Sequence, residues 1–368
     1  MKRLSLVVAA VGVICVGAMG GALSGASVPD GKKLFEEETF GGNGRTCRTC
    51  HSRDTGTTSP QDAQKRFQQN PHDPLFVHDG SDDGLGHGVS RMLTDATVLI
   101  TIPLPAGVIM DGDPNIHSAT FKRGIPTTLN TPALEHIFML DGRQLNLPSQ
   151  AAGAIVAHAQ ALVAPTAAEL QAIADFQLTN QFFSSPSTKH LADGGSPPGL
   201  PAGITASEKR GRFFFEDVVD FDDAKHGFCA ACHSGPMLNQ TNAFLEAIGG
   251  PPIGSRFQSI LVSELNQTEP AHDFEFPGGV HIVSPDPGRA LTTGVADVGN
   301  VFSENVNAFK IPQLRGIRRT APYFHDNSRK TLEDVLDHYA ILFNIVTNGL
   351  ELTAQDKQDI VAFLKLLD

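Results

Sequence analysis

The amino-acid sequence predicts a mostly α-helical protein made of two similar domains, with long loops and few short strands. Three observations lead to this prediction. Helical patterns stand near the start of each half and at the end of the chain, a five-residue cysteine-histidine motif occurs twice, and further features repeat at nearly the spacing of that motif. The 368 residues are enough for two domains of ordinary size.

The first 27 residues form a predicted secretory signal. Lys2 and Arg3 precede an apolar run from Leu4 to Ala18, and small residues follow through Ser27. This order is typical of an exported protein that is cleaved near Ser27, and the run is shorter than the about 20 apolar residues of a membrane span. Cys15 lies in the run and should leave with the signal. We expect a periplasmic protein in which no other stretch can span a bilayer.

The mature chain is acidic. Without Lys2 and Arg3, 26 basic residues face 40 acidic residues, which gives a net charge of −14. Nucleic acid is therefore not an expected partner. In an oxidising compartment the four remaining cysteines must form disulfides, bind a metal or carry a cofactor. Their spacing decides between these options.

All four of these cysteines lie in two motifs of the form Cys-x-x-Cys-His. The motifs are Cys47, Cys50 and His51, and Cys229, Cys232 and His233. This pattern marks c-type haem attachment, because two thiols at this spacing reach the two vinyl groups of one porphyrin and the histidine then ligates the iron. Zinc sites and disulfides also use cysteine pairs, but they do not explain a histidine after each pair. We predict two haem c groups.

A short helix is predicted ahead of each haem motif. In residues 30–40, Leu34 and Phe35 fall on an apolar face. Ahead of the second motif, Thr205 and Glu208 form a capping box, and three phenylalanines follow. Both segments are typical of the opening helix of a cytochrome c domain.

The chain is expected to close with an amphipathic helix and to divide at one linker. Thr353 and Asp356 form the capping box of the closing helix. The Gly- and Pro-rich stretch 193–203 lies between the two haem motifs and is the predicted linker. We expect residues 28–192 to form the N-terminal cytochrome c-like haem domain and residues 204–368 to form the C-terminal one.

An internal repeat relates the two predicted domains. The haem motifs are 182 residues apart, and an Ile-Pro pair and a Phe, Asp and Arg set recur at offsets of 185 to 186. At the offset of 186, Gly153 in the first half corresponds to Tyr339 in the second. The halves are therefore predicted to be copies of one haem domain.

The repeat predicts two unlike irons. Tyr339 ends a predicted helix that could present its phenol to the second iron, whereas the equivalent stretch from Gln150 to Ala154 offers no ligand. We expect the first iron to be open to a small molecule, which suits an enzyme better than an electron carrier. The alternative is that Tyr339 is an ordinary core aromatic residue.

Three further motifs carry a family resemblance. They are the segment 309–326, which reads FKIPQLRGIRRTAPYFHD, the segment Asp286-Pro-Gly-Arg289, and Asp141-Gly-Arg143 with Gln150 beyond it. With these motifs the sequence resembles the bacterial di-haem cytochrome c peroxidases, a family that includes the MauG-type enzymes. The resemblance covers most of the mature chain. It implies that the N-terminal haem reacts with hydrogen peroxide and that the C-terminal haem relays electrons.

The resemblance also implies roles for individual residues. His51 and His233 would be the proximal ligands of the two irons, Gln150 would lie in the distal pocket of the first haem, and Tyr339 would be the sixth ligand of the second. Relatives that act as peroxidases usually have methionine at this last position, whereas the MauG type has tyrosine.

A structural calcium between the haems is implied as well. The backbone carbonyls of Thr320 and Pro322 match two of its ligands, and oxygen is the ligand that calcium prefers. We expect the third ligand from the acidic loop at residues 79–83, with Asp82 as the first choice. A solvated turn is the alternative for that loop.

The sequence departs from the family around the first haem. The distal glutamate is replaced by Gln160, ten residues after Gln150, and an amide cannot take up and return a proton. The inter-haem tryptophan is replaced by Leu140, and the chain has no tryptophan at all. His158 either replaces the glutamate as the acid-base group or is a surface histidine.

Other histidines could cap the first iron in an inactive state. The candidates are His72, His78 and His87, and the sequence does not choose among them.

These features predict an exported di-haem oxidoreductase that reacts with hydrogen peroxide. The electron donor would be a small cytochrome c or cupredoxin, and a MauG-like enzyme would instead oxidise a partner protein. A homodimer is compatible with the family. The alternatives are a non-enzymatic electron-transfer cytochrome and an oxygenase that acts on an organic substrate.

Overall fold

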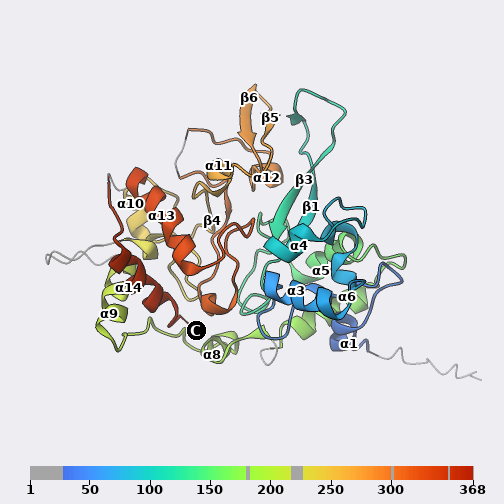
Figure 1. Cartoon of the computed structure of the whole chain (residues 1–368), viewed down its shortest axis with the longest axis horizontal. Helices are drawn as coiled ribbons and strands as arrows, with labels where there is room; N and C mark the ends of the chain where they lie inside the picture. The colour runs from blue at the N-terminus through green and yellow to red at the C-terminus, as the bar shows by residue number, and fades with distance from the viewer. Residues whose placement is uncertain (1–27, 180–182, 217–226, 300–301, 347–348, 368) are drawn as a thin grey trace, which may run out of the picture.

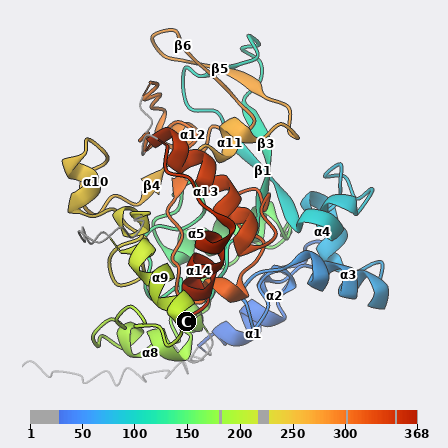
Figure 2. The same ribbon diagram turned by 60° about the vertical axis from the view of Figure 1, so that its left-hand side comes forward.

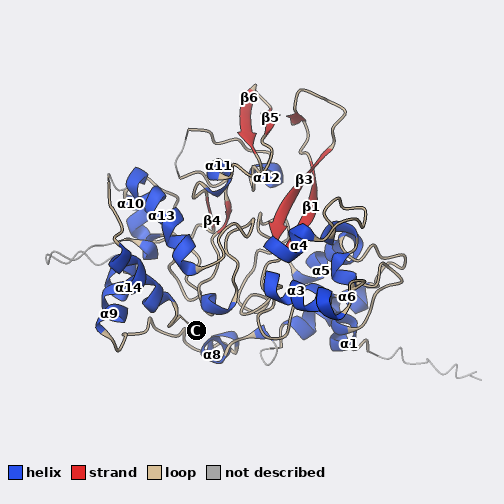
Figure 3. Ribbon diagram, viewed as in Figure 1, coloured by secondary structure: helices blue, strands red, loops and turns tan. Residues whose placement is uncertain are grey.

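The computed structural model describes residues 28–179, 183–216, 227–299, 302–346 and 349–367. The predicted signal, with Cys15, lies outside these residues. Helices and long loops make up most of the fold, and the strands are few and short (Figures 1 and 3). The prediction of a helix-rich chain with few strands is therefore confirmed. No helix in the described ranges is both long and apolar enough to cross a bilayer.

The first helices along the chain belong to the first half. They are α1 (Gly31–Glu36), α2 (Cys47–Cys50), α3 (Pro60–Gln69), α4 (Ser90–Asp95), α5 (Leu147–Ala157) and α6 (Ala167–Gln177). The N-terminal ends carry side-chain caps where the sequence supplies them. Asp30 accepts hydrogen bonds from the backbone of α1, and Thr166 with Glu169 forms a capping box at α6.

The remaining helices lie at the end of the first half and in the second half. Helix α8 (Pro186–Ala192) precedes the predicted linker, and the helices after it are α9 (Ala206–Phe215), α10 (Ala243–Ala247), α11 (Val262–Leu265), α12 (Ala290–Thr293), α13 (Leu332–Val346) and α14 (Ala354–Leu364). The two predicted capping boxes are confirmed. Thr205 and Glu208 open α9, and Thr353 and Asp356 open α14.

The strands form three small antiparallel sheets. In the first sheet β1 (Thr97–Pro103) pairs with β3 (Ser118–Gly124). The second has the order β2 (Ile109–Met110), β5 (His272–Phe276) and β6 (Val280–Ser284), and the third pairs β4 (Phe257–Gln258) with β7 (Phe309–Lys310). Because β2 belongs to the first half and β5 to the second, the backbone of the two halves is hydrogen-bonded across one sheet.

The opening helix of each half packs closely on a later helix of the same half. In the first half α1 packs on α6 (Figure 1), and in the second α9 packs on α14 (Figures 1 and 2). A Cβ atom on Gly31 would lie 1.9 Å from the carbonyl oxygen of Ala172, and one on Gly211 would lie 1.9 Å from that of Asp359. Only glycine allows either crossing, so the two halves use the same packing device.

The apolar core has separate clusters around each half and one that both halves share. The shared cluster joins strand residues of the first half, such as Val98 and Phe121, to Phe274 and Ile282 of the second. The cluster of the second half includes Phe215 and the residues of α14, whereas α1 and α6 enclose a cluster of the first half. The two cysteine motifs therefore lie in parts of the chain that are packed against each other.

Candidate functional site

The first cysteine motif forms the single turn of α2. Thr46 caps this turn with a capping box, and the backbone N–H of His51 donates to the carbonyl of Cys47 at 3.0 Å. The turn thus holds the two thiols three residues apart and the histidine directly behind them. His51 Nδ1 donates to the carbonyl of Gly56 at 2.8 Å, which leaves Nε2 as the atom that can bind a metal.

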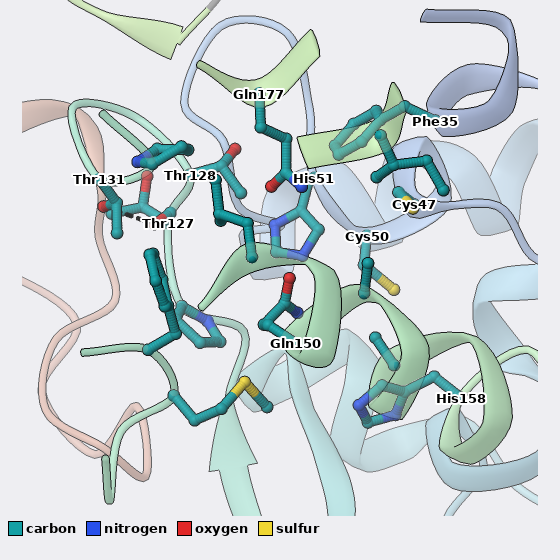
Figure 4. Close-up of a pocket in the computed structure, with 18 of the residues that line it drawn as sticks. Phe35, Cys47, Cys50, His51, Thr127, Thr128, Thr131, Gln150, His158 and Gln177 are labelled. Carbon is teal, nitrogen blue, oxygen red and sulfur yellow. Dashed lines mark hydrogen bonds between the residues drawn. The ribbon is translucent and has the colours of Figure 1, made fainter. Parts of the chain in front are cut away.

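A cavity of about 220 Å³ lies beside this motif. Both thiols, His51, Gln150 and His158 line it, and the Gln150 amide points toward the His51 ring (Figure 4). Most of the wall is apolar. Burial lowers the pKa of His51 to about 4, so its ring is neutral at neutral pH, the form that ligates iron. Two thiols, a neutral imidazole and apolar walls fit a covalently attached haem.

The second motif is built from the short turn η3 (Cys229–Ala231). His233 is buried, and its Nδ1 donates to the carbonyl of Leu238 at 2.9 Å, so its Nε2 is again the potential ligand. Burial lowers the pKa of His233. The cavity beside the motif has a volume of about 590 Å³ and contains Cys229, Cys232 and His233 in its lining. The donor set is the same as in the first cavity and fits a second haem.

The cysteine pairs are thiols and do not form disulfides. Burial raises the pKa of Cys47 to about 12 and raises that of Cys50 as well. In the ranges that the structure describes, no group of three or more histidine, cysteine or acidic residues could hold a metal ion.

Tyr339 lies on α13 and lines the same cavity as His233. Its ring is 5.8 Å from the Phe343 ring and 6.4 Å from the Phe324 ring, measured between centroids. Burial raises the pKa of the Tyr339 phenol. The structure therefore brings the expected sixth ligand and the expected proximal ligand of the second iron to one cavity.

The three residues expected on the distal side of the first haem do not lie together. Gln150 and His158, on and directly after α5, line the cavity. Gln160 is exposed, adopts a φ of 50°, and accepts a hydrogen bond from Asn43 Nδ2 at 3.2 Å. It is not part of the cavity wall, because the chain turns away after α5 ends.

His158 is partly buried, with 26% of its side chain exposed. Its Nδ1 lies 2.5 Å from Asp79 Oδ2, and Asp79 is also paired with the buried Arg45. The sequence motifs do not point to Arg45, and they include Asp79 only in the expected calcium loop. The signal for this contact is weak, because 79 residues separate Asp79 from His158.

The other candidate histidines differ in their surroundings. His72 and His87 are exposed, and His87 Nδ1 lies 2.7 Å from Asp83 Oδ2. His78 lines a further, more polar cavity of about 420 Å³, which we call the outer cavity. It shares Met139, Gln150, Ala154 and His158 with the cavity beside the first cysteine motif, which we call the first haem cavity.

The residues expected to hold a calcium ion have different described contacts. Thr320 and Pro322 line the second cavity. Asp82 instead caps α4, because its two carboxylate oxygens accept from the backbone N–H groups of Ser90 at 3.0 Å and Arg91 at 2.8 Å. Both oxygens of Asp82 are therefore engaged by a helix end.

Leu140 lies between the two haem cavities. It lines both of them, as do Pro126, Thr127, Lys310 and Pro312. The backbone carbonyl of Leu140 accepts from the N–H of Lys310 at 2.7 Å, which ties the two halves together at this point. An aliphatic side chain thus stands in the position expected for the inter-haem tryptophan.

Comparisons with known proteins find peroxidases and MauG proteins. A cytochrome c peroxidase of Pseudomonas sp. strain SCT is 26% identical over 171 residues, which cover 45% of this chain and 40% of the relative. The cytochrome c551 peroxidase of Nitrosomonas europaea is 29% identical over 152 residues, or 41% of this chain and 34% of the relative. The MauG protein of Methylorubrum extorquens is 38% identical over 68 residues, or 16% and 19%.

The match spans less than half the length of each of these relatives, and no family model matches the sequence. The crystal structure of a MauG-like protein associated with microbial copper homeostasis aligns with a TM-score of 0.50 at 20% identity, covering 93% of this chain and 90% of that one. This similarity extends over nearly the whole chain and shows a shared fold. The relatives confirm the resemblance that the sequence motifs predict.

Proposed function

We propose that this chain, a relative of the bacterial di-haem cytochrome c peroxidases and MauG proteins, is an exported di-haem oxidoreductase that reduces hydrogen peroxide. The observation that carries the proposal is the difference between the two cavities. Opposite His51 stands Gln150, whose amide is a poor iron ligand, whereas the cavity of His233 contains the phenol of Tyr339. One iron would be open to peroxide and the other capped.

The residues that would hold the haems are those of the two motifs. Cys47 and Cys50 would carry the first haem and Cys229 and Cys232 the second, with the following histidine of each motif as proximal ligand. Bound haem supplies iron that exchanges electrons with peroxide and with a donor. The matched crossings of α1 on α6 and of α9 on α14 support the proposal that two cytochrome c-like domains arose as copies.

On the open side, the protein groups would bind and orient peroxide. The Gln150 amide can donate to one oxygen of the substrate and accept from its proton. The outer cavity, which Gln150 and His158 share with the first haem cavity, offers a route for peroxide and water. His78 lines this route and is the candidate among the three histidines to approach the first haem.

On the capped side, Tyr339 would fix the second haem in a state that relays electrons. The donor would be a small cytochrome c or a cupredoxin in the periplasm. With tyrosine as the ligand, oxidation of a partner protein, as in MauG-type enzymes, is the variant of this function that we also propose to test. A structural calcium held by the Thr320 and Pro322 carbonyls, and a homodimer, remain further proposals.

A second function, electron transfer without catalysis, is favoured by Leu140 and Gln160. Leu140 places an aliphatic side chain between the two cavities. Gln160 leaves no carboxylate at the position where the family has its distal glutamate. Electrons would then only pass through the chain.

The absorption spectrum of the oxidised holoprotein, with and without peroxide, separates the two functions. A high-spin component that changes when peroxide is added supports the peroxidase. Two low-spin haems whose spectrum does not change when peroxide is added support the electron carrier and would refute the proposed peroxidase function.

A further inference from the structure

We propose that His158 is the acid-base group beside the first haem and that Asp79, held in place by Arg45, is the residue that positions it. This inference rests on the proposed function for its chemistry. It rests on the described contacts for its geometry.

The position of His158 is fixed from both sides of its backbone. Its N–H donates to the carbonyl of Ala154 at 2.8 Å, as the last turn of α5. Its carbonyl accepts from Asn43 Nδ2 at 2.9 Å and from Arg45 Nη1 at 3.4 Å. The end of α5 is thereby tied to the segment that leads into the first cysteine motif.

Arg45 is held rigidly because each nitrogen of its guanidinium donates a hydrogen bond. Only 2% of the residue is exposed, and its guanidinium donates to the carbonyls of Pro74 at 2.8 Å, Leu75 at 2.9 Å and Val77 at 2.6 Å. The same guanidinium pairs with Asp79 Oδ1. At Gly80 a Cβ atom would lie 2.4 Å from Arg45 Nη2, so the neighbouring residue must be glycine for the loop to close on the arginine.

Asp79 is a buried carboxylate that is kept ionised. Burial alone would raise its pKa, but the hydrogen bond with His158 and the charge of Arg45 outweigh burial and hold the pKa of Asp79 below its usual value. An ionised carboxylate can only accept hydrogen bonds, so His158 Nδ1 must carry the proton in the 2.5 Å contact. In the neutral ring Nε2 then has the lone pair.

The ring lies where a proton has to pass. His158 lines both the first haem cavity and the outer cavity. Asp79 lines the outer cavity but not the first haem cavity. Gln160 cannot share this role, since it is exposed and its amide has no acid-base function at neutral pH. The dyad thus lies at the boundary of the two cavities, with His158 in the wall of the one that would hold the first haem.

The chemistry balances with His158 unchanged at the end. Reduction of one hydrogen peroxide to two waters takes two electrons, which the donor protein supplies, and two protons from solvent. Nε2 takes the first proton from bound peroxide and returns it to the oxygen that leaves as water when the O–O bond breaks. Asp79 stabilises the positive ring between these two events.

The test uses the holoprotein and four variants, H158Q, D79N, D79E and Q160E. The rate constant for the reaction with hydrogen peroxide is measured by stopped-flow absorption. H158Q should lower it by about 10²–10⁴-fold, the usual contribution of general acid-base catalysis. D79N should lower it by about 10–100-fold, as is typical when the partner that orients a functional histidine is lost. D79E, which restores the charge, should recover part of the loss.

The matched control is D111N. Asp111 directly follows β2, and its Oδ2 lies 2.7 Å from Nδ1 of His272 on β5; neither residue is in the wall of a haem cavity. This variant removes the charge from an exposed Asp-His contact and should leave the rate unchanged.

A second readout does not depend on activity. In ¹⁵N-histidine-labelled protein, NMR should show His158 protonated on Nδ1 in the wild type and a changed tautomer in D79N, with H158Q identifying the signal. If D79N fails to fold, H158Q and D79E still test the proposal, because both variants keep a carboxylate at position 79.

The outcomes separate the two proposals. Rates of H158Q and D79N that match D111N, or a faster Q160E alongside an unaffected H158Q, overturn the role of His158. A wild type that does not react with peroxide overturns the proposed function and the acid-base role with it, whereas the NMR tautomer still decides whether Asp79 positions the ring.

Discussion

Replacing Arg123 with methionine removes the positive charge from a buried cluster that joins the two halves of the chain. Arg123 lies on β3, is 1% exposed, and binds Asp286 of the second half at 2.7 and 2.9 Å. Its third contact is with Asp141 at 2.5 Å. Methionine has a similar length but cannot pair with either carboxylate, so Asp286 loses its charged partner.

The expected loss of stability is large because these charges are buried. Removing one partner of a buried ion pair typically costs about 3–5 kcal/mol, since the other partner is left without compensation. The entropy of unfolding is about 2.1 cal/mol/K per residue, or about 0.7 kcal/mol/K for the 341 residues after Ser27. The melting temperature of R123M should therefore fall by about 4–7 °C.

The measurement is thermal unfolding of the holoprotein, followed by far-UV circular dichroism. Lys122, the neighbouring residue on β3, supplies the control. Its Nζ pairs with Glu269 at 2.8 Å, but 41% of its side chain is exposed. Exposed pairs contribute only about 0–1 kcal/mol, so K122M should lower the melting temperature by little more than about 1 °C.

A double variant tests the reasoning itself. In R123M/D286L the stranded carboxylate is replaced by an apolar side chain, so the loss should be smaller than the sum of the two single losses. The stabilising role of the buried Arg123–Asp286 pair is refuted if R123M melts no lower than K122M. It is also refuted if the decreases in melting temperature of R123M and D286L add up to that of the double variant.

Three further predictions follow from the two cavities and the buried cluster. Mass spectrometry of the denatured protein should find two haems still attached, and one haem, or zinc, would contradict the assignment of the motifs. Y339F should change the low-spin signal of one haem, whereas Y323F, at the other of the two tyrosines, should not, because the Tyr323 hydroxyl donates to the Ile317 carbonyl at 3.1 Å; identical spectra for both variants would remove Tyr339 as a ligand. Burial opposes ionisation of Asp141, but the charges of Arg123 and Arg143 outweigh burial and lower the pKa of Asp141 from its ordinary value of 3.8. The ionised Asp141 therefore contributes its full stabilisation above pH 3.8, and this contribution is lost as the pH falls through the lowered pKa of the folded protein. Urea unfolding of the wild type and D141N should therefore differ at neutral pH and converge in acid, and a constant difference would argue against the linkage.

The local features of this protein can be read from its sequence alone. Each haem motif is a contiguous run of five residues, so its chemistry can be read without knowing the fold. The capping boxes at Thr205 and Thr353 are equally local, because a cap is formed by residues within one turn of each other. The family resemblance also follows from short contiguous motifs.

Which side chains reach the first haem cavity depends on how distant segments of the chain fold together. Counting ten residues from Gln150 points to Gln160, but α5 ends at Ala157 and the left-handed turn at residue 160 directs that side chain away from the cavity. His158 reaches it instead, and the partner that fixes His158 comes from residue 79. A contact between residues 79 and 158 depends on how distant segments pack, and the sequence pattern around either residue does not predict it. The same holds for Asp82, which the packing of its loop commits to the end of α4.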